Sequence, residues 1–121
     1  MPPFQPRPTY PYSAGAKGGN YVFTAGQVGW NEHGVLVGIG DVRAQTRQVL
    51  RNIESILAEG GATFADVVKC NVYLADIRHF QIMNEEFAKA FPTDPPARTT
   101  IQAALAEPEM LVEIEAIAYV D

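Results

Sequence analysis

Apolar residues in this chain recur at a period of about two in some segments and about 3.6 in others, so strands and amphipathic helices must alternate along it. A first helix is predicted to begin at a cap on Asp41 and to end at Gly60-Gly61, where glycine tolerates the left-handed conformation. A second helix is predicted between a cap on Asp76 and the stop at Pro92. Five segments have strand character: 21–25, 35–37, 67–74, 98–104 and 111–119.

This order predicts a two-layer α/β (α+β) domain over residues 1–121, with two helices on one face of a mixed sheet. We expect the sheet to have six strands, although only five segments with strand character are identified above. In the segment 67–74, one face is predicted to carry Val68, Cys70, Val72 and Leu74. The sheet face without helices carries aliphatic and aromatic groups with a few charges, which predicts a subunit interface. Residues 1–11 hold five prolines and are predicted to form an extended arm.

The chain is acidic, with 14 Asp and Glu against 9 Lys and Arg, whereas a nucleic-acid binder usually carries a basic patch. The nearest approach to a basic cluster is Arg43, Arg47 and Arg51, which we interpret as a solvated helix face. The single cysteine excludes an internal disulfide and is typical of a reducing compartment. No apolar run approaches the ~20 residues of a membrane span, so we expect a soluble, cytoplasmic protein.

Two charged residues are candidates for chemistry. Arg98 follows the rigid stretch Pro95-Pro96-Ala97 at the start of a strand, where its guanidinium could grip a carboxylate through two parallel hydrogen bonds. The alternative is a surface arginine that pairs with any nearby acid. Glu113 interrupts an apolar strand. It is either a general acid or base whose pKa is raised in a pocket, or an ordinary outward-facing residue.

Two uncharged residues are weaker candidates. Asn84 lies on the apolar stripe of the second helix, where its amide needs a partner from the backbone or from a ligand pocket. Tyr12 follows Pro11 in an extended segment and either lines a pocket or packs the arm. His33 and His79 lack paired ligand spacing, which argues against a metal site. Cys70 lies in an apolar strand and is interpreted as a buried small hydrophobic residue.

Several short motifs occur together in order along almost the whole chain. They are Pro11-Tyr12-Ser13, Ala25-Gly26-Gln27-Val28, Gln45-Thr46 with Asn52, Phe80 with Asn84, Pro95-Pro96-Ala97-Arg98-Thr99 and Val112-Glu113-Ile114-Glu115-Ala116. In this combination the chain resembles the Rid family of reactive intermediate deaminases, also called the YjgF or L-PSP endoribonuclease family. Tyr10 and Ala14 depart from the usual family residues and are expected near the pocket wall.

The resemblance implies a chorismate-mutase-like subunit in a homotrimer, with active sites in clefts between subunits. It implies hydrolysis of 2-imino acids and their 2-aminoacrylate-type enamines to 2-oxo acids and ammonia, without a metal or organic cofactor. Arg98 would bind the substrate carboxylate, and Glu113 would handle the attacking water or the leaving nitrogen. Tyr12, Asn84 and the backbone at Thr100 correspond to pocket positions.

Two other functions stay open on the residues alone. One is a non-catalytic, carboxylate-binding or chaperone-like trimer, in which Arg98 would still bind a 2-oxo acid. The other is a ribonuclease or translation inhibitor, which the older family name suggests and the acidic charge balance disfavours.

Overall fold

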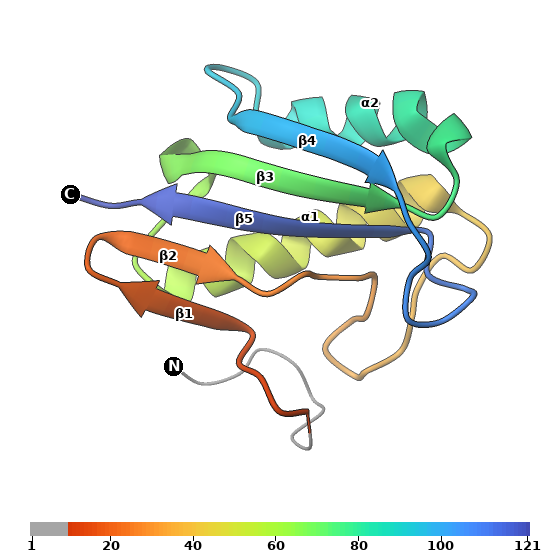
Figure 1. Cartoon of the computed structure of the whole chain (residues 1–121), viewed down its shortest axis with the longest axis horizontal. Coiled ribbons are helices and arrows are strands. Elements are labelled where there is room, and N and C mark those ends of the chain that lie inside the picture. Colours follow the sequence, from red (N-terminus) through yellow and green to blue (C-terminus); the bar gives the residue numbers. More distant parts are fainter. Residues whose placement is uncertain (1–9) are drawn as a thin grey trace.

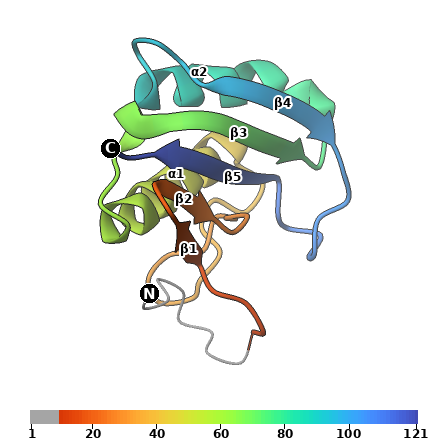
Figure 2. The same cartoon turned by 60° about the vertical axis from the view of Figure 1, so that its left-hand side comes forward.

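Five strands form one mixed sheet, and helices α1 and α2 lie together on one of its faces (Figures 1 and 2). The computed structural model describes residues 10–121, so the arm predicted for residues 1–11 falls almost entirely outside the described residues. The strands are β1 (Gly15–Gly18), β2 (Tyr21–Thr24), β3 (Val67–Leu74), β4 (Ala97–Gln102) and β5 (Val112–Tyr119). The helices are α1 (Val42–Glu59) and α2 (Phe80–Ala90), and two short 3-10 turns cover Phe64–Asp66 and Ile77–His79.

The strands lie in the order β1-β2-β5-β3-β4, and only β3 and β4 run parallel. The two-layer prediction is confirmed, but the expected six strands are wrong. The segment 35–37 makes only an isolated bridge between Trp30 and Leu36, whereas the unforeseen β1 pairs with β2. The loop cannot extend into a strand because Gly34, Gly38 and Gly40 all adopt positive φ angles, which turn the chain repeatedly.

Helix α1 begins and ends where the sequence predicts. The Asp41 side chain accepts a hydrogen bond from the Ala44 N–H at 3.1 Å, and Gly61 follows the helix with φ +82°. Asp76, in contrast, caps the 3-10 turn by accepting from the Arg78 N–H, and α2 begins only at Phe80. The 3.6-residue period places Ile77, Phe80, Asn84, Phe87 and Phe91 on the apolar stripe of the second helix. That stripe is only partly buried, because Ile77 and Phe80 are 42% and 40% exposed.

The prediction for the face of β3 is wrong at its first residue. Val68 is 48% exposed, and Val67 is buried in its place. The cause is an irregularity between Val67 and Lys69 in the pairing with β5, because a β-bulge shifts the inward–outward alternation by one residue. From Cys70 to Leu74 the alternation follows the prediction.

The interpretation of the α1 arginines as a solvated face is incomplete: Arg47 and Arg51 are exposed and Arg43 is half-buried, but two of the three bind a specific partner. Arg43 and Arg47 reach across to α2 and bind the buried carboxylate of Glu86, at 2.6 and 2.8 Å. Lys89 adds a third contact at 3.1 Å. These three cations lower the pKa of Glu86 to about 2. The hydrogen bond from Arg47 has the largest effect on that pKa, followed by those from Arg43 and Lys89. The cluster joins the two helices over the core, and Arg51 lies outside it.

Across residues 10–121, none of the helices combines the length and the apolar character needed to cross a bilayer.

Candidate functional site

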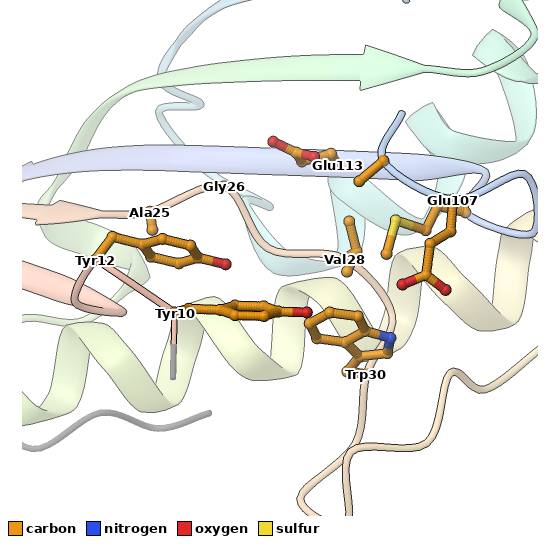
Figure 3. A pocket seen from close by; sticks show the side chains of 10 residues that line it. Tyr10, Tyr12, Ala25, Gly26, Val28, Trp30, Glu107 and Glu113 are labelled. Atoms are coloured by element: carbon orange, nitrogen blue, oxygen red, sulfur yellow. The ribbon is translucent and has the colours of Figure 1, made fainter. Parts of the chain in front are cut away.

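A pocket of about 430 Å³ opens where three separate segments meet beside β5 (Figure 3). We call it the aromatic pocket; it is lined by Tyr10, Tyr12, Ala25, Gly26, Val28, Trp30, Ala106, Glu107, Met110 and Glu113. Its size lies in the range of about 300–1,000 Å³ that is usual for small-molecule sites. Two of the predicted site residues, Tyr12 and Glu113, therefore meet in one concavity.

The backbone opens beside Glu113 because the ladder between β2 and β5 is interrupted. Pairing ends at Phe23 and resumes at the bridge between Gln27 and Ile114, with hydrogen bonds of 2.8 and 3.0 Å. Within the gap, the Thr24 hydroxyl accepts the Ala116 N–H at 3.0 Å in place of a backbone carbonyl. Residue 26 must be glycine for the site to keep this shape, because a Cβ there would overlap the carboxylate of Glu113.

Buried amides on α1 fix the two loops that wall the pocket. Asn52 donates from Nδ2 to the carbonyls of Val28 and Trp30, at 3.1 and 2.8 Å. Gln45 donates to the carbonyl of Glu109 at 2.9 Å and accepts the Leu111 N–H at 2.9 Å. These bonds satisfy polar groups that burial would otherwise penalise, and they make the pocket walls rigid.

Glu113 has the surroundings of a poised acid or base. Burial is the main cause that raises its pKa above the ordinary value, and the neighbouring charge of Glu115 adds to the effect. Among residues 10–121 no side chain donates a hydrogen bond to the Glu113 carboxylate. The hydroxyl of Tyr73 and the amide of Asn71 instead bind Glu115, at 3.1 and 3.2 Å. Of the two glutamates on this face of β5, Glu113 is therefore the one left to act on a ligand.

Arg98 lies at a second concavity, between α2 and the Pro95-Pro96 turn. We call it the Arg98 groove; it has a volume of about 320 Å³ and is lined by Asn84, Phe87, Ala88, Phe91, Pro95, Pro96 and Arg98. The guanidinium Nη2 donates to Asn84 Oδ1 at 2.6 Å, and the guanidinium carbon lies 4.8 Å from the ring centre of Phe87. Asn84 and Phe87 thus hold a cation in one orientation, with donors left for an anion.

The two concavities lie on opposite faces of the sheet. In the strand register Arg98 pairs with Cys70, whose side chain points toward the helices, whereas Glu113 pairs with Tyr73 on the helix-free face. One chain therefore brings Arg98 together with Asn84, and Tyr12 together with Glu113, but does not join the two pairs. Thr100 faces the helices and lines neither concavity; its buried hydroxyl has no partner among residues 10–121.

Comparison with known proteins places the chain in a family. The family model described as endoribonuclease L-PSP matches residues 4–120. The chain belongs to the Rid/YjgF/L-PSP family. A RutC family protein of Pyrococcus abyssi is 41% identical over 114 residues, which cover 94% of this chain and 90% of the relative. A protein of Acinetobacter baylyi named 3-aminoacrylate deaminase RutC is 35% identical over 120 residues, 99% of this chain and 95% of the relative.

Solved structures agree with this assignment. The crystal structure of RidA from the Antarctic bacterium Psychrobacter sp. superposes with a TM-score of 0.86 at 36% identity, covering 97% of this chain and 94% of that one. The resemblance inferred from the sequence motifs is therefore confirmed, and the fold is the Rid fold.

The structure of this Rid protein adds pocket residues that the sequence does not single out. Trp30 and Glu107 come from loops without a periodic pattern, so no local signal marks them. Tyr10 lines the aromatic pocket as expected, but Ala14 does not. The thiol of Cys70 is buried, which raises its pKa to about 12 and removes it as a nucleophile at neutral pH. Within residues 10–121, no group of three or more His, Cys, Asp or Glu side chains could hold a metal ion.

Proposed function

We propose that this Rid protein is a deaminase that hydrolyses 2-imino acids and their 2-aminoacrylate-type enamines to 2-oxo acids and ammonia. The observation that carries the proposal is the pair of incomplete sites on opposite sheet faces, one suited to a carboxylate and the other to proton transfer. The relative named 3-aminoacrylate deaminase supports the same class of reaction. The reaction would take place where the Arg98 groove of one subunit meets the aromatic pocket of its neighbour.

Arg98 is the carboxylate-binding residue in this proposal. Its guanidinium is held by Asn84 and by the ring of Phe87, so little side-chain freedom is lost when it binds a substrate. A two-point grip fixes the plane of the carboxylate and therefore the position of the adjacent imine carbon. Orientation matters here because a protonated imine is already electrophilic and needs only a placed water molecule.

Glu113 is the proton-transfer residue. As a carboxylate it takes a proton from water while the oxygen bonds to the imine carbon, which gives a tetrahedral carbinolamine. Glu113 then returns that proton to the nitrogen and, as a carboxylate again, takes the hydroxyl proton of the carbinolamine while the carbon–nitrogen bond breaks, so that the carbonyl forms and ammonia leaves. An enamine substrate first takes a proton on its terminal carbon to become the imine. The raised pKa of Glu113 suits a group that must both accept and donate.

A cyclic homotrimer accounts for the location of the two sites. Since the Arg98 groove and the aromatic pocket are different surfaces, a contact that joins them is heterologous, and heterologous contacts close into rings. The helix-free face also exposes an aromatic cluster of Tyr21, Phe23 and Tyr119, each at least 40% exposed. The rings of Tyr21 and Tyr119 lie 5.2 Å apart. An exposed patch of this kind is typical of a subunit interface.

The test is a coupled assay in which an amino acid oxidase generates 2-imino acids and semicarbazide traps whatever imine remains. We expect wild type to suppress semicarbazone formation and Arg98→Ala to lose that effect while keeping its fold. If wild type never exceeds the background rate on fresh 2-iminobutanoate, the deaminase proposal fails. Native mass spectrometry of the same sample tests for three copies.

A further inference from the structure

Two glutamates on one face of β5 direct their carboxylates to opposite neighbours. Glu113 and Glu115 are two residues apart, so both side chains leave the strand on the helix-free face. The carboxylate of Glu115 reaches β3, where it accepts hydrogen bonds from Tyr73 and Asn71 at 3.1 and 3.2 Å. The carboxylate of Glu113 lies against Gly26, in the segment that follows β2. Since β5 lies between β2 and β3, the two carboxylates diverge.

The strand register offers Tyr73 to Glu113 rather than to Glu115. In the pairing of β3 with β5, Tyr73 lies directly opposite Glu113, and Asn71 lies directly opposite Glu115. Directly opposite side chains on one face are the closest cross-strand neighbours, yet the Tyr73 hydroxyl reaches diagonally to Glu115. Burial raises the pKa of Tyr73, followed by the hydrogen bond and charge of Glu115, and the charge of Glu113 adds to the rise. The hydroxyl is therefore within electrostatic reach of both carboxylates.

A hydroxyl that donated to Glu113 instead would weaken Glu113 as a base in two ways. It would draw the carboxylate toward β3, away from Gly26 and the pocket. It would also lower the pKa of Glu113, because a hydrogen bond to a carboxylate favours its charged form. The negative charge of Glu115 acts in the opposite direction and, after burial, raises the pKa of Glu113.

Other titratable groups lie on the elements around Glu113. They are Tyr10 and Tyr12 before β1, Glu107 on the loop before β5, Lys69 on β3, and Tyr21 on β2, which pairs with the far end of β5. The ammonium of Lys69 donates to the Thr99 hydroxyl of β4 at 2.9 Å. In the proposed trimer, Arg98 of the neighbouring subunit would also approach Glu113 and lower its pKa. The charge of Glu115 would oppose that effect.

We propose that Glu115 is a positioning residue, which holds the Tyr73 hydroxyl on β3 and so leaves the Glu113 carboxylate in the aromatic pocket, able to accept and return a proton. The proposal rests on the deaminase function, because Glu113 is the group that acts on the substrate there. Glu115 acts only through Glu113, since it is not among the described residues that line the pocket.

The experiment uses the whole chain with Glu115→Leu, Tyr73→Phe, both changes together, or Glu107→Gln as a comparator. Leucine is close to glutamate in size but accepts no hydrogen bond, so the Tyr73 hydroxyl is released. Carbon-13 NMR of labelled glutamate side chains follows the titration of Glu113, whose signal is absent from Glu113→Gln. The pH dependence of kcat/KM is measured with 2-iminobutanoate.

We expect Glu115→Leu to lower kcat/KM about tenfold at neutral pH, the cost of breaking one charge-assisted hydrogen bond to Glu113. Glu113 should titrate at lower pH than in wild type, and the acid limb of the profile should move with it. The double variant should regain most of the lost activity, because no hydroxyl is left to bind Glu113. Glu115→Gln, which also lacks the charge, should move the titration in the same direction if leucine is not tolerated.

A double variant no more active than Glu115→Leu would overturn the proposal, since the Tyr73 hydroxyl would then not compete for Glu113. The proposal is also wrong if Glu107→Gln moves the Glu113 titration as far as Glu115→Leu does, because any carboxylate nearby would then have the same effect. If wild type does not hydrolyse 2-iminobutanoate, the deaminase proposal fails, whereas the NMR titration still decides whether Glu115 controls Glu113.

Discussion

Replacing Arg98 with lysine separates the geometry of the carboxylate grip from its charge. Lysine keeps the positive charge but has a single ammonium in place of a planar fork. It cannot donate two parallel hydrogen bonds to a carboxylate while also stacking 4.8 Å from the Phe87 ring. The hydrogen bond to Asn84, 2.6 Å in the wild type, also loses its fixed geometry.

The expected loss follows from the bond that disappears. One charge-assisted hydrogen bond contributes about 1.5–3 kcal/mol, so Arg98→Lys should lower kcat/KM roughly 10- to 100-fold. The cation–π contact of an arginine contributes about 0.5–1 kcal/mol at a partly exposed site, so the free energy of unfolding should fall by no more than about 1 kcal/mol.

The assay is the semicarbazide competition with 2-iminobutanoate, run beside urea denaturation of the same samples. Arg51→Lys is the control, because Arg51 is an exposed arginine on α1 outside both concavities. If Arg98→Lys stays within about twofold of wild type, the two-point grip is refuted. Asn84→Asp extends the test, since a carboxylate there would pair with Arg98 and compete with the substrate.

Three further predictions concern other residues. Glu113→Gln should lower kcat by about 10²–10⁴-fold. It should also raise the melting temperature at neutral pH, because the raised pKa of Glu113 makes wild-type stability fall as pH rises through that pKa; thermal melts at several pH values check the sign. Gly26→Ala should reduce activity by displacing the Glu113 carboxylate, whereas Gly18→Ala, with only an ordinary contact, should not; steady-state kinetics decides. Glu86→Gln should destabilise the protein by about 2 kcal/mol, less than the ~3–5 of a fully buried pair because its arginine partners are partly exposed. The wild-type contribution of Glu86 should be complete above its ordinary pKa of 4.5 and disappear as pH falls toward about 2, which urea titrations follow.

The elements of this fold were predictable where a local rule determines them. Asp41 and Gly61 bound α1 as expected, because capping and left-handed glycine depend on neighbouring residues only. The exposure of Val68 was not predictable, since a bulge depends on the register between two strands that are distant in sequence. Strand β1 was not predicted for a similar reason. Its residues, Gly15–Gly18, have little strand propensity, and the strand forms by pairing with β2.

The candidate site, too, was predictable where local sequence determines it and not where it depends on tertiary packing. Arg98 and Glu113 stand out because charged residues are unusual in those sequence contexts, but their positions on opposite faces depend on tertiary packing. Strand β4 is an edge strand on which Ile101 is 47% exposed while Arg98 faces the helices, so hydrophobicity does not determine its inner face. The Asn52 amide that supports the Trp30 loop follows no periodic rule either, since its partners are backbone carbonyls.

The central claim is that one subunit supplies Arg98 and the next supplies Glu113, and mixed oligomers test it most directly. Arg98→Ala and Glu113→Gln proteins, each inactive alone, are unfolded together and refolded. If a heterologous trimer forms by random mixing, about one site in four regains both residues, so we expect about a quarter of the wild-type deaminase rate. As a control, Arg98→Ala mixed with the double variant should regain nothing. If mass spectrometry shows mixed trimers but activity stays at that of the separate variants, Arg98 and Glu113 do not meet across a subunit boundary, and the proposed shared site is refuted.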